Sequence, residues 1–313
     1  MRRTLPTFLI IGVAKAGTTS VYAYLKEHPQ IYMSPIKETN YFAYQGKDTK
    51  TFLGKKPYNE FPVTTMEQYL ALFEHAADKV AIGEASPLYF ESPVAAARIK
   101  RTLPEAKLIV ILRNPVERAF SDYMMGLSSG RGTWVMEEAF RENGHMVQVG
   151  FYYEKLKRYF DCFARERIKV YLYDDLKTDP LRTMKNMFCD VGVDPSFEPN
   201  TSVRYNVGGA PKNRTLNTML VKGAQNRILK SVAPQFVVNY FQDMWRKNLS
   251  NEVTLPEDLR RKLTNLYSQD ILQTQELIKK DLTHWLELVT KVFLFLIVNC
   301  ASYMDSDASM LLT

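Results

Sequence analysis

Lys15, Gly17 and three hydroxyl side chains stand together near the start of the chain, directly after an apolar run. Residues 8–20 read FLIIGVAKAGTTS, which predicts a strand, a tight loop and then a helix. Backbone N–H groups in such a loop converge on an anion, the helix N-terminus adds partial positive charge, and a lysine ammonium adds a full charge. The pattern therefore predicts a site for a phosphate-bearing ligand. The alternative is a glycine turn with a solvated lysine.

The loop differs from an ordinary nucleotide P-loop in the place of its lysine. That P-loop is G-x-x-x-x-G-K-[ST], with the lysine directly after the second glycine. Here Gly12 and Gly17 keep the spacing, but Thr18 follows Gly17 and the lysine is residue 15. In that P-loop a hydroxyl residue directly after the lysine holds Mg²⁺, and no such residue follows Lys15 here, so a nucleotide kinase is a remote alternative. A non-catalytic nucleotide-binding protein is another remote alternative. We expect that no metal is required, since no histidine pair has metal-ligand spacing.

The elements that position this loop are strands alternating with helical segments. Apolar runs predict strands at 7–13, 80–83, 108–112 and 168–172, and helices are expected at 18–27, 93–101, 115–125, 154–164, 180–191, 216–229 and 259–279. The alternation predicts an α/β fold, a P-loop-like parallel sheet flanked by helices on both faces, with helical additions. In such folds the ligand lies beyond the carboxyl ends of the strands. Residues 15–20, 84–87 and 113–121 follow three of these runs and are the first candidates.

Composition sets the class of protein and of partner. The 313 residues are 46% hydrophobic and 24% charged, typical of a globular protein, and we expect one domain over residues 1–285. The net charge of +7 favours anionic ligands, but the basic residues are dispersed, so no nucleic acid partner is expected. The cysteines, Cys162, Cys189 and Cys300, are far apart, which favours a reducing, cytoplasmic setting without a disulfide framework.

The two ends of the chain carry separate expectations. The first residues run directly into the first strand, so no signal peptide is expected. Residues 286–313 form an apolar tail of unknown role that charged residues interrupt. Its pattern favours a packed terminal helix over membrane contact, because a spanning helix needs about 20 predominantly apolar residues.

Four segments, in this order, resemble the sulfotransferases that use 3′-phosphoadenosine 5′-phosphosulfate (PAPS), in the branch of heparan-sulfate-type and bacterial natural-product enzymes. They are FLIIGVAKAGTTSVYAYLKEHPQI, PIKETNYF, GEASPLYF and KLIVILRNPVERAFSDYMMG. GFYYEKLKRYF, VYLYDDLKTDP and DLTHW agree as well, so the resemblance covers residues 6–285. It implies the sulfotransferase fold and an enzyme that moves a sulfuryl group from PAPS to an acceptor, leaving adenosine 3′,5′-bisphosphate.

The resemblance implies ligands for the two ends of PAPS. The residues implied at the 5′-phosphosulfate are Lys15, Ala16, Gly17, Thr18, Thr19 and Ser20, with Lys15 at the bridging and sulfuryl oxygens. Arg113 and Ser121 match the 3′-phosphate ligands, and a guanidinium can bind phosphate through a planar fork. The loop YNVGGAPKNRTLN would add Tyr205 at the adenine and Lys212, Asn213 and Arg214 at the 3′-phosphate.

Glu38, in KETNYF, matches the general base of the glycan branch. A carboxylate within hydrogen-bond reach can take the proton of an acceptor hydroxyl or amine, and Lys37 would steady charge beside it. The alternative is a surface acid flanked by Lys37. His145 is the next candidate base.

The expected acceptor is a small molecule or natural product, with a heparan-like glycan as the alternative. Many glycan-branch members have a lysine where this chain has Ala85, and the missing charge disfavours a highly anionic acceptor. Glu84 would face a cationic acceptor or form a structural ion pair. The candidate acceptor-binding residues are Lys37, Glu84, Met125, His145 and Tyr152. Aromatic and methionine residues such as Tyr152 and Met125 are, however, more often core.

Overall fold

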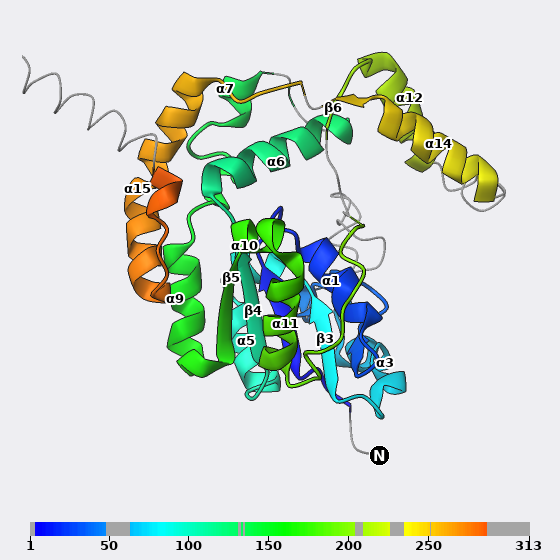
Figure 1. Cartoon of the computed structure of the whole chain (residues 1–313), viewed down its shortest axis with the longest axis vertical. Helices are drawn as coiled ribbons and strands as arrows, with labels where there is room; N and C mark the ends of the chain where they lie inside the picture. Colours follow the sequence, from blue (N-terminus) through cyan, green and yellow to red (C-terminus); the bar gives the residue numbers. More distant parts are fainter. Residues whose placement is uncertain are drawn as a thin grey trace, which may run out of the picture. The chain divides into compact units, whose positions relative to one another are not determined.

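The computed structural model describes residues 4–47, 63–130, 133, 135–203, 209–225, 235–250 and 252–286 (Figure 1). The chain divides into two compact units. The first unit is Met1–Arg113 with Glu154–Gly208, and the second is Asn114–Tyr153 with Gly209–Thr313. A single domain over residues 1–285 stays a prediction, and the predicted tail lies outside the described residues beyond Leu286.

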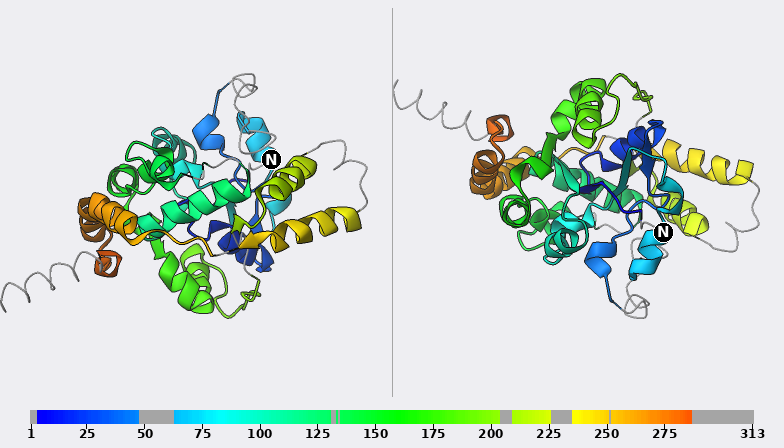
Figure 2. Two further views of the ribbon diagram at one scale, coloured as in Figure 1. Left: turned by 90° about the horizontal axis from the view of Figure 1, so that it is seen from above. Right: turned by 90° about the horizontal axis from the view of Figure 1, so that it is seen from below.

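A five-stranded parallel sheet in the order β2-β3-β1-β4-β5 forms the centre of the first unit. Its strands are β1 (Phe8–Gly12), β2 (Ile31–Met33), β3 (Ala81–Ala85), β4 (Lys107–Leu112) and β5 (Ile168–Leu172). Every residue of β1 and β3 is buried, as expected for parallel strands covered on both faces. Figures 1 and 2 show helices on both faces, which confirms the predicted α/β fold class.

The first unit contains eight α-helices among its described residues, and α11 shows how such a helix begins and ends. They are α1 (Thr18–Glu27), α2 (Tyr41–Tyr44), α3 (Met66–Ala71), α4 (Leu88–Glu91), α5 (Ala95–Thr102), α9 (Tyr153–Cys162), α10 (Tyr173–Thr178) and α11 (Pro180–Val191), with short 3-10 turns at Glu74–Ala76 and Arg165–Arg167. Asp179 caps α11 by accepting the N–H of Arg182 at 3.0 Å, and the left-handed Gly192 ends it. Such capping gives hydrogen-bond partners to the backbone N–H and C=O groups that lack an intrahelical partner at helix ends.

The second unit is mainly helical. Its elements are α6 (Pro115–Ser128), α7 (Met136–Ala139), α8 (His145–Gln148), α12 (Arg214–Gln225), α14 (Gln235–Lys247), α15 (Glu257–Ile278), the 3-10 turn η4 (Thr283–Leu286), and the antiparallel pair β6 (Ala210–Pro211) and β7 (Leu249–Ser250). Helices α12 and α14 lie side by side (Figure 2). Within the described part of the chain, none of the helices is long and apolar enough to span a bilayer.

Candidate active site

The loop between β1 and α1 leaves the start of the helix without a side-chain cap. Lys15 and Gly17 adopt left-handed backbone conformations, with φ of 72° and 82°, and Gly17 makes no capping side-chain hydrogen bond. Between them, Ala16 is fully buried. Because the first N–H groups of a helix lack intrahelical partners, an anion can take the place of the missing cap. The loop therefore fits the phosphate group that the sequence predicts there.

Helix α10 packs against this loop at Gly17. A Cβ atom on Gly17 would lie 2.9 Å from Cδ2 of Leu176 and 3.2 Å from the ring of Tyr173. Both neighbours belong to α10, which begins directly after β5. Glycine is therefore required at position 17 for its backbone conformation and for this close approach.

Arg113 connects the loop to the end of β4. Its Nη1 donates to the carbonyl of Lys15 at 2.9 Å, and its guanidinium carbon lies 4.6 Å from the centre of the Tyr173 ring. This geometry is that of a cation–π contact. The structure thus brings together Lys15, Arg113 and Gly17, three residues that the sequence assigned to one nucleotide site.

Glu38 lies in a segment that extends the sheet at the same edge. The N–H of Ser34 donates to the carbonyl of Gly83, and that of Glu38 donates to the carbonyl of Ala85, each at 2.8 Å. The Glu38 side chain is 26% exposed and forms an ion pair with Lys37. The expected pairing of Glu38 with Lys37 is therefore present.

Glu84 does not have either of its two expected environments. Its side chain is fully buried, and its carboxylate accepts hydrogen bonds from four hydroxyl groups, those of Thr39, Tyr69, Ser86 and Tyr89. A fully buried carboxylate saturated by hydroxyl donors has no surface for an acceptor, and its partners here are neutral rather than cationic. The assignment of Glu84 to acceptor binding is corrected accordingly.

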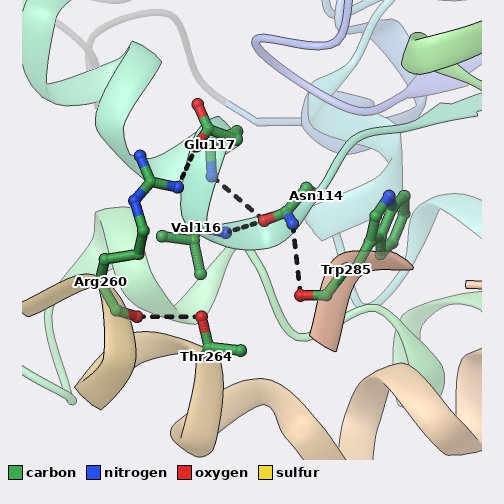
Figure 3. Close-up of polar contacts among 6 residues, drawn as sticks. All are labelled: Asn114, Val116, Glu117, Arg260, Thr264 and Trp285. Carbon is green, nitrogen blue, oxygen red and sulfur yellow. Dashed lines mark hydrogen bonds and ion pairs between the residues drawn. The ribbon is translucent and has the colours of Figure 1, made fainter. Parts of the chain in front are cut away.

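Ser121, a predicted 3′-phosphate ligand, is half-buried on α6 in the second unit. The start of α6 is firmly anchored (Figure 3). Asn114 Oδ1 accepts the N–H groups of Val116 and Glu117 at 3.0 and 3.3 Å, and Glu117 forms an ion pair with Arg260 of α15. These contacts fix the helix on which Ser121 lies.

The predicted late loop also belongs to the second unit. Lys212 and Arg214 are exposed, while the N–H of Lys212 donates to the carbonyl of Asn248 at 2.7 Å. Asn213 Oδ1 accepts the N–H of Leu216 at 2.9 Å and so caps α12. Tyr205 lies outside the described residues.

The candidate acceptor residues of the second unit have different surroundings. His145 is exposed at the start of α8, and Met125 is half-buried on α6. Tyr152 is fully buried, its N–H donates to Asp270 at 2.7 Å, and its ring lies 6.5 Å from that of Trp285. Tyr152 is therefore a core residue, which corrects its assignment to the acceptor. Among the described residues, no cluster of three His, Cys, Asp or Glu side chains is placed to hold a metal ion.

Two residues of this edge, Tyr173 and Thr39, were missed by the sequence analysis. Tyr173 directly follows β5, so the rule that pointed to residues after the other strands applies to it as well. Thr39 stands beside Glu38 and donates to Glu84, and no sequence pattern marks that contact.

The comparisons with known proteins show the family of this chain. A model described as the sulfotransferase family matches residues 6–198, and the chain belongs to that family. A crystal structure of a sulfotransferase from Alicyclobacillus acidocaldarius is 27% identical with a TM-score of 0.64, covering 90% of this chain and 99% of that one. The family and the fold inferred from the four motifs are thus confirmed.

Two curated relatives extend the comparison. Membrane-associated sulfotransferase kil1 of Dictyostelium discoideum is 38% identical over 122 residues, which are 38% of this chain and 22% of that protein. Carbohydrate sulfotransferase 15 of Mus musculus is 28% identical over 286 residues, covering 69% of this chain and 50% of that protein. This chain thus spans half or less of the length of these two relatives.

Proposed function

We propose that this chain is a sulfotransferase that uses PAPS as the sulfuryl donor. The observation that carries the proposal is the arrangement of charge at one sheet edge. Three groups of the first unit make up this arrangement. They are the start of α1, which has no side-chain cap, Lys15 just before it, and the Arg113 guanidinium, which donates to the Lys15 carbonyl. Backbone N–H groups and fixed positive charge are the groups that stabilise a phosphosulfate.

In the proposed reaction, Glu38 takes the proton of the acceptor hydroxyl or amine as that oxygen or nitrogen bonds to sulfur. The bond between sulfur and the bridging phosphate oxygen breaks, and adenosine 3′,5′-bisphosphate leaves. Lys15 offsets the negative charge that develops on that oxygen. This assignment is supported by the sheet, because the chain reaches Lys15 from β1 and Glu38 from β2, two parallel strands of one sheet.

The 3′-phosphate is assigned to residues that match the family motifs. We assign it to Arg113 and Ser121, with Lys212, Asn213 and Arg214 completing the site and Tyr205 at the adenine. Exposure of Lys212 and Arg214 is compatible with a ligand contact. The side-chain oxygen of Asn213 already caps α12, so its amide N–H₂ group is the part assigned to phosphate.

The acceptor class proposed is a small molecule or natural product with a hydroxyl or amine. Ala85, where many glycan-branch members have lysine, is fully buried in β3 and offers no charge to an anionic glycan. A glycan is the second candidate, because the mouse relative is a carbohydrate sulfotransferase by name. His145 and Met125 are proposed to lie near the acceptor.

The decisive experiment has two parts. Calorimetry at modest salt measures binding of adenosine 3′,5′-bisphosphate, and incubation with isotope-labelled PAPS follows label transfer by mass spectrometry. The acceptor panel contains phenols, aliphatic alcohols, amines and heparan-type oligosaccharides. We expect nucleotide binding and label on a small-molecule acceptor. Label on oligosaccharides alone would favour the second candidate, and absence of nucleotide binding would refute the function.

A further inference from the structure

The buried carboxylate of Glu84 is the least expected polar group near the proposed base. Oε1 accepts from Tyr69 at 2.9 Å and Tyr89 at 2.8 Å, and Oε2 accepts from Thr39 at 2.5 Å and Ser86 at 3.0 Å. A carboxylate has about four lone-pair sites, so these four hydroxyls satisfy it completely. Burial raises the pKa of Glu84, and the four hydrogen bonds oppose that rise.

Three of these hydroxyls also receive backbone N–H groups from the segment after Glu38. Ser86 Oγ accepts from Asn40 at 3.1 Å, Thr39 Oγ1 from Tyr41 at 3.4 Å and the Tyr89 hydroxyl from Phe42 at 3.4 Å. These N–H groups stand at the start of α2, where the N-cap residue makes no side-chain capping bond. Each hydroxyl thus donates to Glu84 and accepts from the backbone, so Glu84 orients the groups that cap α2.

The backbone held in this way is in an uncommon conformation. Glu38 and Asn40 have φ of 63° and 52°, in the left-handed region that residues other than glycine seldom occupy. Such a conformation is strained for a residue with a Cβ atom and persists only where surrounding contacts enforce it. The N–H of Glu38 donates to the carbonyl of Ala85, and the Thr39 hydroxyl donates to Glu84. The N–H of Asn40 donates to Ser86, which itself donates to Glu84.

We infer that Glu84 is a positioning residue, which acts through Thr39 and Ser86 to fix the backbone turn that presents the Glu38 carboxylate to the acceptor. The inference rests on the proposed role of Glu38 as the base. It gives Glu84 a function at the site without contact with any substrate. It also assigns a purpose to Thr39, whose hydroxyl is the member of the network adjacent to Glu38 in sequence.

The test uses a matched pair at position 39. Thr39→Val removes the hydroxyl with little change of shape, and Thr39→Ser keeps it. We expect Thr39→Val to lower kcat about 10- to 100-fold, the range expected when a reacting group moves by about 1 Å. Affinity for adenosine 3′,5′-bisphosphate should stay within about twofold, and Thr39→Ser should restore most of kcat. Glu84→Gln, which replaces an acceptor oxygen with a donor, should act in the same direction as Thr39→Val.

Two further measurements separate positioning from general destabilisation. In a Glu38→Gln background, Thr39→Val should lower kcat no further, because the group that it positions is already absent. Amide hydrogen exchange of residues 37–44 should accelerate in Thr39→Val and Glu84→Gln. Asp190→Asn is the control: it makes the same carboxylate-to-amide change at the Asp190 carboxylate that accepts from Tyr171 and pairs with Lys169, elsewhere in the first unit, and it should change neither readout.

The outcomes distinguish the inference from the proposed function. An unchanged kcat in folded Thr39→Val, or an equal loss in the Glu38→Gln background, overturns the positioning role. If the wild-type chain transfers no sulfuryl group, the proposed function fails. Even then, hydrogen exchange decides whether Glu84 holds residues 37–44. Unchanged exchange in both Thr39→Val and Glu84→Gln would overturn that part of the inference.

Discussion

Two segments at one edge of the sheet have left-handed backbone conformations, and different forces hold them. The loop at residues 13–17 is held by packing of Gly17 on α10 and by the Arg113 hydrogen bond to Lys15. The segment at residues 34–42 is held by hydrogen bonds to β3 and to hydroxyls around the buried Glu84. Both solutions fix a charged residue, Lys15 in one segment and Glu38 in the other.

The difference follows from the task proposed for each segment. A loop that receives an anion must keep backbone donors for the ligand, so it cannot be fixed by capping those donors with side chains. A segment that presents a base uses its side chain for chemistry, so its backbone N–H groups are available for internal hydrogen bonds. Packing and a hydrogen bond to the Lys15 carbonyl, which leaves the backbone donors untouched, hold the first segment, and buried hydrogen bonds hold the second.

The largest expected effects come from the charged residues themselves. Lys15→Ala and Glu38→Gln should each lower sulfuryl transfer by about 100-fold or more, because each removes a group that acts in the transition state. Only Lys15→Ala should also weaken binding of adenosine 3′,5′-bisphosphate. Initial rates with labelled PAPS and calorimetry measure the two effects. Full activity of Glu38→Gln would move the base elsewhere, and His145→Ala would be tested next.

Gly17→Ala tests whether packing holds the first segment. The new methyl group meets Leu176 and Tyr173, and the left-handed φ of 82° adds backbone strain. Gly46→Ala is the matched control, since its φ is 75° and nothing lies within 4 Å of the added carbon. We expect Gly17→Ala to lower the free energy of unfolding by about 1–3 kcal/mol more than Gly46→Ala, as overpacking does. Urea denaturation measures both, and equal losses would show that strain alone matters.

The sequence predicted the segments whose pattern is local. The residues of α1, α11 and β5 were predicted at their observed bounds. Gly17 precedes α1, Pro180 and Gly192 bound α11, and β5 is a short apolar run. Strand β2 was missed because Ile31–Met33 is too short to show a period. The late loop YNVGGAPKNRTLN also contains the short strand β6, whose pairing with β7 is not local.

Within the candidate site, the types of residue were easier to predict from sequence than their environments. Lys15 and Arg113 were proposed because each comes just after a predicted strand, whereas Glu38 was proposed from the resemblance of KETNYF to the glycan branch. The environment of Glu84 was not predictable, because its hydroxyl partners come from positions 39, 69, 86 and 89, and burial of the group depends on their convergence. The contact of Tyr173 with Arg113 likewise joins residues that are distant in sequence.

A smaller effect is expected where the first segment meets α10. Tyr173→Leu removes the ring that faces the Arg113 guanidinium at 4.6 Å, whereas Tyr173→Phe keeps it. A cation–π contact of about 0.5–1 kcal/mol corresponds to about a two- to fivefold weakening of nucleotide affinity in Tyr173→Leu. Calorimetry with adenosine 3′,5′-bisphosphate measures it, and Tyr173→Phe should bind like the wild type. An equal loss in both variants would assign the effect to the hydroxyl instead.

The smallest effect is a pH dependence of stability that comes from Glu84 of β3, whose hydroxyl partners hold the second segment. Burial raises the pKa of Glu84 above its ordinary value of 4.5, and this outweighs the opposing hydrogen bonds. A carboxyl whose pKa is higher in the folded state contributes stability that is complete below the unfolded pKa and is lost as the pH rises through the folded pKa. Glu84→Gln cannot titrate at this position. The free energy of unfolding of the wild type, minus that of Glu84→Gln, should therefore be largest below about pH 4.5 and decline above it. Urea denaturation of both proteins from acid to neutral pH measures this difference. A difference that increases with pH would mean that the four hydroxyl hydrogen bonds outweigh burial and hold the carboxylate in its charged form.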